Sequence, residues 1–234
     1  MLEVNNCTIV FPSESGGAVA APSDFSLSVR EREILGLTGP SGCGKTALGT
    51  ALLGILERPG RVACGSAVYS FRDGGAADIF ALPEQKLRKL RGRELGMVFQ
   101  DPVAALNPSR KISAQFLDVL RTHDRALTRA QRLNAAREML ERMMFAEPDR
   151  VMDSYPFELS GGMCQRAVIA LALMPRPRLL IADEPTTALD TKNQAQILRL
   201  LRELRDSLDM SIILISHDMD VVSAIADTVV RMES

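Results

Sequence analysis

A glycine-rich stretch at residues 39–46 is the part of the sequence best suited to chemistry. It reads Gly-Pro-Ser-Gly-Cys-Gly-Lys-Thr and matches the pattern G-x-x-x-x-G-K-[ST]. In such a loop, glycines let backbone N–H groups curl around phosphate oxygens, and the following helix directs its positive end at them. Lys45 would hold the β- and γ-phosphates of a nucleotide, and the Thr46 hydroxyl would ligate Mg²⁺. The residues expected around the phosphates are Gly39, Pro40, Ser41, Gly42, Cys43, Gly44, Lys45 and Thr46.

The alternative is a plain glycine-rich turn. The loop follows an apolar, strand-like segment and opens a helix-like one, as phosphate binding requires, which favours the phosphate site.

Two adjacent acids, Asp183 and Glu184, follow the apolar segment 179–182. The carboxyl ends of strands are where open α/β sheets bind ligands. Asp183 would belong to the Mg²⁺ shell, and Glu184 would polarise the attacking water in phosphoryl transfer. Exposed acids at a strand end are common, so the pair carries weight only together with the phosphate loop.

His217 and Cys43 each allow two interpretations. A histidine at a strand end is more often a polar cap, but the position of His217 after the segment 211–216 suggests a hydrogen bond to the γ-phosphate or to water. Cys43 lies beside Lys45 and backbone N–H groups, a setting that favours a thiolate. We hypothesise that its alkylation blocks nucleotide binding. An inert thiol that fills space is the open alternative.

The segments that carry these residues predict an α/β fold. Apolar strands alternate with helices, which implies a parallel sheet covered on both faces, with a helical block inserted between residues 101 and 165. The predicted strands are 8–11, 25–29, 34–38, 96–99, 179–182 and 211–216, with a turn at 12–17 and a hairpin within 62–71. The predicted helices are 46–56, 84–90, 112–144, one from about 161 to Pro175, and 192–208.

Composition excludes several classes of protein. The chain has 234 residues, of which 46% are hydrophobic and 24% charged, with a formal net charge of -1. This charge gives no general attraction to nucleic acid or anionic lipid. The four cysteines form no C-x-x-C pair, which indicates a reduced setting. The most apolar run, 167–174, is too short to span a bilayer, so a membrane role would require a partner.

The stretch 159–166, Leu-Ser-Gly-Gly-Met-Cys-Gln-Arg, resembles the signature motif of ABC-transporter ATPases. Ser160 can cap a helix, and Gly161 and Gly162 would expose backbone N–H groups at its positive end. This makes a second phosphate site in the chain. A lone Ser-Gly-Gly would mean only a tight turn, but here it lies upstream of the Asp–Glu pair at the spacing of that family.

The resemblance implies roles for further residues. Gln100 looks like the Q-loop glutamine, in contact with both Mg²⁺ and the reaction; the stretch 188–190, ending at Asp190, looks like the D-loop; and His217 looks like the switch histidine. Phe11 would stack on adenine, although a lone strand phenylalanine is usually core.

The implied fold is a P-loop NTPase of the ABC-ATPase type: a mostly parallel core sheet with an N-terminal antiparallel β subdomain and an inserted helical subdomain. A single domain would span 1–234, with its core in 1–100 and 166–234 and the helical signature subdomain in 101–165.

In such proteins two ATPase subunits face each other head to tail, with each ATP between one subunit's phosphate loop and the other's signature helix. The resemblance implies ATP and Mg²⁺ as cofactors, ATP hydrolysis, and a second ATPase subunit, identical or different. It also implies two transmembrane permease subunits and, indirectly, an extracytoplasmic substrate-binding protein, but no nucleic acid. The chain would sit peripherally on the cytoplasmic side of the inner membrane. A groove near Gln100 would transmit motion to the permease, with 101–108 as hinge.

Within that family the chain is most similar to ATPases of oligopeptide, dipeptide and nickel importers, through the stretches 53–56, 59–61, 97–102, 106–108 and 155–158. Met163 stands where many family members carry glutamine, and this subgroup often has methionine there. Family members usually continue beyond Ser234 with further strands and a C-terminal extension.

Two other functions are alternatives. One is an ABC ATPase outside transport, whose members usually carry two such units or a coiled-coil insertion. The other is a subunit that signals nucleotide occupancy without turnover, against which Glu184 and His217 argue.

Overall fold

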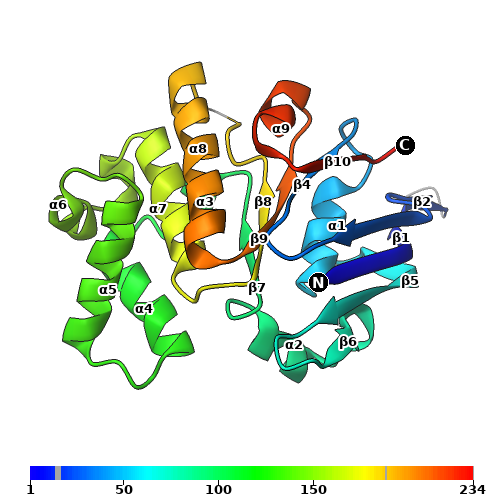
Figure 1. The fold of residues 1–234 in the computed structure, drawn as a ribbon, viewed down its shortest axis with the longest axis horizontal. Coiled ribbons are helices and arrows are strands. Elements are labelled where there is room, and N and C mark those ends of the chain that lie inside the picture. The colour runs from blue at the N-terminus through cyan, green and yellow to red at the C-terminus, as the bar shows by residue number, and fades with distance from the viewer. Residues whose placement is uncertain (14–16, 188, 234) are drawn as a thin grey trace.

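The computed structural model describes residues 1–13, 17–187 and 189–233, and it contains two sheets (Figure 1). The predicted turn at 12–17 includes residues 14–16 and the predicted D-loop begins at Ala188; both therefore lie partly outside the described residues. The strands are β1 (Leu2–Pro12), β2 (Ala18–Ala20), β3 (Phe25–Val29), β4 (Ile34–Thr38), β5 (Arg61–Ser70), β6 (Ala76–Asp78), β7 (Leu95–Val98), β8 (Leu179–Asp183), β9 (Ser211–Ile215) and β10 (Thr228–Arg231).

The helices lie between these strands in the order expected for an α/β protein. They are α1 (Lys45–Leu52), α2 (Glu84–Leu90), α3 (Pro102–Ala105), α4 (Ile112–His123), α5 (Arg129–Arg142), α6 (Pro148–Asp153), α7 (Gly161–Leu173), α8 (Thr191–Leu208) and α9 (Met219–Ile225), with 3₁₀ turns η1 (Ile79–Ala81) and η2 (Pro156–Glu158). Among the described residues, no helix combines the length and apolar character needed to cross a bilayer.

The central sheet is parallel, with strand order β10-β4-β9-β8-β7. Its strands are apolar on both faces, and successive side chains point to opposite sides. Leu180 and Ala182 pack with the helices α4 to α9, whereas Leu179 and Ile181 pack with α1 and the antiparallel sheet. The sheet thus separates two hydrophobic cores. In Figure 1 the helices α4 to α7 lie on one side of the sheet, and α1 and the antiparallel sheet lie on the other.

The antiparallel sheet is formed by the order β2-β1-β5-β6, with β3 also paired to β1. It confirms the predicted strand 25–29. The hairpin predicted within 62–71 is wrong, because this segment is the single strand β5. Gly65, with φ of 96°, lies opposite a register shift in β1 between Asn5 and Thr8, and a Cβ on it would come within 2.6 Å of the Asn6 oxygen. The turn that does form lies after β5, where Phe71 and Gly75 share a backbone hydrogen bond.

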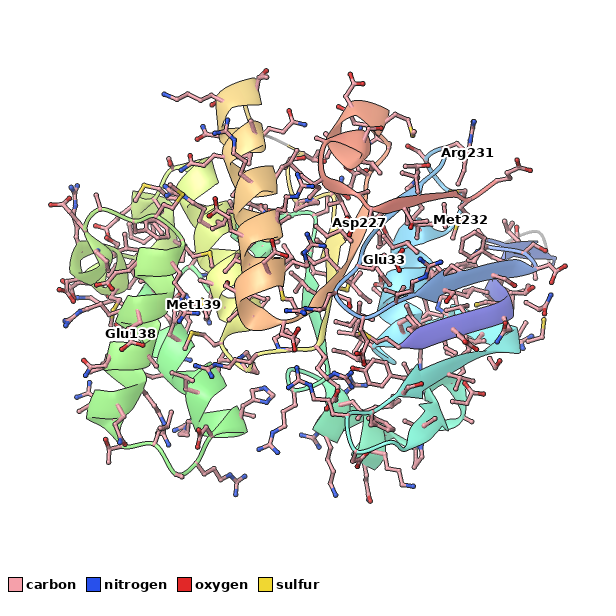
Figure 2. All side chains as sticks on the ribbon, in the orientation of Figure 1. Glu33, Glu138, Met139, Asp227, Arg231 and Met232 are labelled. Atoms are coloured by element: carbon pink, nitrogen blue, oxygen red, sulfur yellow. The ribbon has the colours of Figure 1, made fainter. Side chains whose placement is uncertain are left out.

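The helical block is built from amphipathic helices that pack on one another. The predicted helix 112–144 is two helices, because the Thr128 side chain caps a new helix, α5, after a break. Met139 of α5 belongs to the core of the block, while its neighbour Glu138 is exposed (Figure 2). Helix α7 starts inside the predicted helical subdomain and continues past residue 165, and the division into subdomains remains a prediction.

Two elements near the C-terminal end were not predicted: α9 and β10. Asp227, between them, accepts hydrogen bonds from Ile34 N at 2.8 Å and from Arg205 Nη1 at 3.0 Å. These bonds join β10, β4 and α8 at the edge where Figure 2 labels Asp227 and Glu33. The backbone N–H of Met232 continues the pairing by donating to Thr38 O at 2.7 Å.

Arg178, just before β8, ties the two sheets together. Its guanidinium donates to Ser70 O at the end of β5 at 3.1 Å and to Glu31 Oε1 at 2.7 Å. Glu94 lies 3.8 Å away and accepts a hydrogen bond from the Tyr69 hydroxyl at 2.8 Å. Burial, followed by the bond to Glu94, raises the pKa of Tyr69, so this hydroxyl stays a donor.

Truncating Arg178 should destabilise the protein more than truncating an arginine in an exposed pair. Arg178 is 9% exposed, and Arg178→Ala leaves Ser70 O and the Glu31 carboxylate without this donor and removes the positive charge beside Glu94. We expect a loss of about 2 kcal/mol in the free energy of unfolding. The control is Arg150→Ala, whose pair with Glu147 is 80% exposed on the arginine side and should contribute less than about 0.5 kcal/mol. Urea denaturation measures both, and equal losses would contradict the role of Arg178.

Candidate functional site

A cavity of about 580 Å³ lies at the carboxyl ends of the parallel strands. The phosphate loop follows β4, Gln100 follows β7 by two residues, Asp183 ends β8, and His217 follows β9 by two residues. Most of the predicted site residues therefore meet here, although they come from five separate segments, counting β1 with Phe11. The residues lining the cavity are Phe11, Val19, Ala21, Ser41, Gly42, Gly44, Lys45, Thr46, Ala47, Gln100, Asp183, Glu184 and His217.

The phosphate loop has a shape that only glycine allows. Gly42 and Gly44 have φ of 84° and 103°, and a Cβ on Gly44 would come within 2.3 Å of the Ala21 carbonyl carbon. Gly44 is also the N-cap of α1, which no side chain of the described residues caps. The first N–H groups of α1 therefore face the cavity end of the loop, an arrangement suited to an anion.

Lys45 is held inside its own loop. Its Nζ donates to Gly39 O at 2.8 Å and to Pro40 O at 2.9 Å, and the side chain is buried. The ammonium thus lies under the loop with its position set by backbone carbonyls. This places a fixed positive charge beside the N-terminus of α1.

Asp183 has the character of a cation ligand. It is buried, and among the described residues its Oδ1 has no hydrogen-bond partner. Burial raises the pKa of Asp183, while an interaction with the Thr46 hydroxyl and the charge of Lys45 act in the opposite direction. A buried carboxylate oxygen without a donor, next to a hydroxyl, fits a divalent cation.

The candidate metal ligands Thr46, Gln100 and Asp183 include one carboxylate. Within the described ranges, no group of three or more His, Cys, Asp or Glu side chains could hold a metal by itself. Mg²⁺ suits such a site, since it keeps several waters and takes phosphate oxygens from its substrate.

Glu184 is engaged on both carboxylate oxygens. Oε1 lies 2.6 Å from His217 Nδ1 and accepts the His217 backbone N–H at 2.9 Å. Oε2 accepts the Thr187 hydroxyl at 2.8 Å and the Ser216 hydroxyl at 3.4 Å. Glu184 has φ of 47°, a conformation uncommon outside glycine, and is held there by this network. The sequence predictions missed Thr187 and Ser216. For Thr187 a signal was present, because its hydroxyl stands three residues after the acid Glu184.

The structure bears differently on the alternative interpretations of Phe11 and Cys43. Phe11 lines the cavity but also packs against Gly60, so it serves the core as well as the cavity wall. Cys43 is 4% exposed, belongs to the same hydrophobic core as Leu48, and does not line the cavity. Its Sγ lies 3.7 Å from Lys45 Nζ. This burial favours a thiol that fills space.

The second candidate phosphate site lies apart from the first. Ser160 caps α7, where its Oγ accepts Met163 N at 3.4 Å, and both Ser160 and Gly161 are exposed. Neither lines the cavity around Lys45. Asp190 caps α8 through Asn193, and the Asn193 side chain would lie 3.6 Å from a Cβ on Gly162. Asp190 and the Ser160 turn therefore form one surface, separate from the Lys45 cavity.

The chain resembles known proteins over nearly its whole length. A family model described as ABC transporter matches residues 22–187. The oligopeptide transport ATP-binding protein OppD of Salmonella typhimurium is 42% identical over 232 residues, which are 99% of this chain and 67% of OppD. The glutathione import ATP-binding protein GsiA of Pectobacterium atrosepticum is 41% identical over 99% of this chain and 37% of GsiA.

A solved structure is similar as well. The ATP-binding cassette MJ0796, described as a dimer in a post-hydrolysis state bound to ADP and Pi, matches with a TM-score of 0.83 and 26% identity, covering 100% of this chain and 96% of MJ0796. The chain spans about two thirds of the length of these relatives: 67% of OppD from Salmonella typhimurium and 66% of OppD from Escherichia coli.

Alkylation of the native protein distinguishes the interpretations of Cys43. Cys64 is the exposed thiol among the described residues, whereas Cys7, Cys43 and Cys164 are buried. Burial, with a contribution from Cys64, raises the pKa of Cys7 to about 11, which keeps it protonated. We expect iodoacetamide to modify Cys64 at least roughly tenfold faster than Cys43, with no effect of Mg-ATP on Cys43. Peptide mass spectrometry measures this, and rapid labelling of Cys43 that Mg-ATP prevents would support the reactive thiolate instead.

Proposed function

The chain belongs to the ABC transporter family, and on that premise we propose that it is the ATP-binding and ATP-hydrolysing subunit of a peptide importer. The observation that carries the proposal is the meeting of Lys45, Asp183, Glu184 and His217 in one cavity, at the ends of adjacent parallel strands. The peptide cargo is supported by the names of two similar proteins, an oligopeptide transport ATP-binding protein and a glutathione import ATP-binding protein. Nickel or metal chelates, the other cargo of the resembled subgroup, are the alternative.

ATP would enter the cavity with its triphosphate on the loop 39–46. The ammonium of Lys45 and the N–H groups at the start of α1 bind the β- and γ-phosphates, and Phe11 packs on adenine. Thr46, Gln100 and Asp183 would hold Mg²⁺, which neutralises charge on the phosphate oxygens when bound.

Glu184 acts on the attacking water. The water oxygen forms a bond to the γ-phosphorus while the bond from phosphorus to the β–γ bridging oxygen breaks, and the water proton passes to the Glu184 carboxylate. The products are ADP and inorganic phosphate. The His217 ring lies 2.6 Å from Glu184 Oε1 and binds the γ-phosphate when it turns away from that oxygen.

The surface formed by Ser160, Gly161, Gly162 and Asp190 would face a second ATPase subunit. Because this surface is exposed and lies away from the Lys45 cavity, one chain offers two half-sites that a head-to-tail pair completes. The exposed Phe99 and Val103, next to Gln100, suit the groove that receives a permease subunit at the cytoplasmic side of the membrane. The substrate-binding protein would act through that permease.

Two substitutions test the roles in the cavity. Glu184→Gln removes the base but keeps the shape, so we expect ATP hydrolysis to fall by roughly 100-fold or more while ATP binding persists and a closed, ATP-bound pair accumulates. Lys45→Ala should instead weaken ATP binding. Phosphate release and nucleotide-binding titrations separate the two effects, and undiminished hydrolysis in both variants would overturn the assignment.

Ser160→Arg tests the shared site. Since Ser160 does not line the cavity of its own chain, the variant should bind ATP with unchanged affinity as an isolated subunit. Its bulk and charge would block the approach of a second subunit's triphosphate, so steady-state hydrolysis should fall by roughly tenfold or more. Hydrolysis at the wild-type rate, or a loss of ATP affinity in the isolated subunit, would contradict the composite site.

A further inference from the structure

The carboxylate of Glu184 is fully engaged by its surroundings. An ionised carboxylate has about four acceptor positions, two on each oxygen. His217 contacts Oε1 with its ring and its backbone N–H, at 2.6 and 2.9 Å. Thr187 and Ser216 donate their hydroxyls to Oε2, at 2.8 and 3.4 Å. The two oxygens are therefore held by different kinds of partner.

Of the two hydroxyls on Oε2, Thr187 is the stronger donor. Its 2.8 Å distance is typical of an O–H···O bond, whereas the 3.4 Å from Ser216 is long. The Ser216 oxygen also accepts Asp218 N at 3.1 Å, which draws it toward the start of α9. Thr187 is thus the main contact that fixes Oε2.

The backbone supports this contact. Thr187 N donates to Glu184 O at 3.2 Å, closing a turn, so the turn is joined by both a backbone and a side-chain bond. Within this turn Glu184 has its unusual φ of 47°. A hydroxyl at residue 187 is therefore brought to the Glu184 carboxylate by the same turn that aims the carboxylate at the cavity.

We propose that Thr187 is a positioning residue for ATP hydrolysis, an inference that rests on the function proposed above. It holds Oε2, so that Oε1 faces the cavity and is the oxygen that takes the water proton. The His217 ring, 60% exposed and lining the cavity, is the partner of Oε1 that can turn away to admit water. Thr187 does not line the cavity, so it acts through Glu184 and not on ATP.

The experiment compares three variants under steady-state conditions with Mg-ATP. Thr187→Val keeps the shape and removes the hydroxyl, and we expect kcat to fall roughly fivefold to tenfold with KM for ATP unchanged. Thr187→Ser keeps the donor and should restore kcat to within about twofold of the wild type. Ser216→Ala removes the longer bond and should have a smaller effect than Thr187→Val.

A double-mutant cycle identifies the path of the effect. In the Glu184→Gln background, Thr187→Val should cause no further fall in kcat, because the carboxylate it positions is gone. Wild-type kcat in Thr187→Val, equal losses in the valine and serine variants, or a raised KM with kcat unchanged would each overturn the inference. Absence of hydrolysis by the wild type would overturn the proposed function instead, so the two failures are distinguishable.

Discussion

The parallel register of the central sheet is the constraint on which the site depends. β4 pairs with β9, β9 with β8 and β8 with β7, with Leu37 and Asp183 both opposite Ile215. All four strands therefore end at the same edge, and the loops that leave them share one cavity. A slip of one residue would turn the side chain at 183 to the other face and remove the acid from that edge. The same alternation fills the two cores, so packing and site geometry are set by one register.

The elements with strong local signals could be predicted from the sequence, and so could the residues at their ends. The strand 34–38 is a short apolar run followed by a glycine-rich loop, and it forms with the predicted bounds. Asp183, Glu184 and His217 meet as expected because parallel strands end together. The hairpin within 62–71 failed because a glycine opposite an irregularity of the neighbouring strand has the same sequence signal as a glycine in a turn. The contacts of Thr187 and Ser216 depend on the backbone angle of Glu184, which no residue pattern reveals.

The helical block and the second candidate phosphate site are mechanically linked. Arg166 of α7 donates to the carbonyls of Met143 and Met144 at 3.1 and 3.0 Å, and its guanidinium stacks on the Phe145 ring at 4.3 Å. These contacts attach the helix that Ser160 caps to the segment after α5. The helix that Ser160 caps therefore packs with the segment after α5, whereas Cys43 of the Lys45 loop belongs to the other core.

The two carbonyl contacts of Lys45 decide what the arrival of a nucleotide can contribute. The Lys45 ammonium already donates to the carbonyl oxygens of Gly39 and Pro40. Triphosphate oxygens would therefore replace these acceptors and would not supply missing ones. The net gain is the difference between two sets of hydrogen bonds, which is far smaller than the strength of either set. The contacts of Lys45 within its own loop therefore limit how much the ammonium can add to the affinity for a nucleotide.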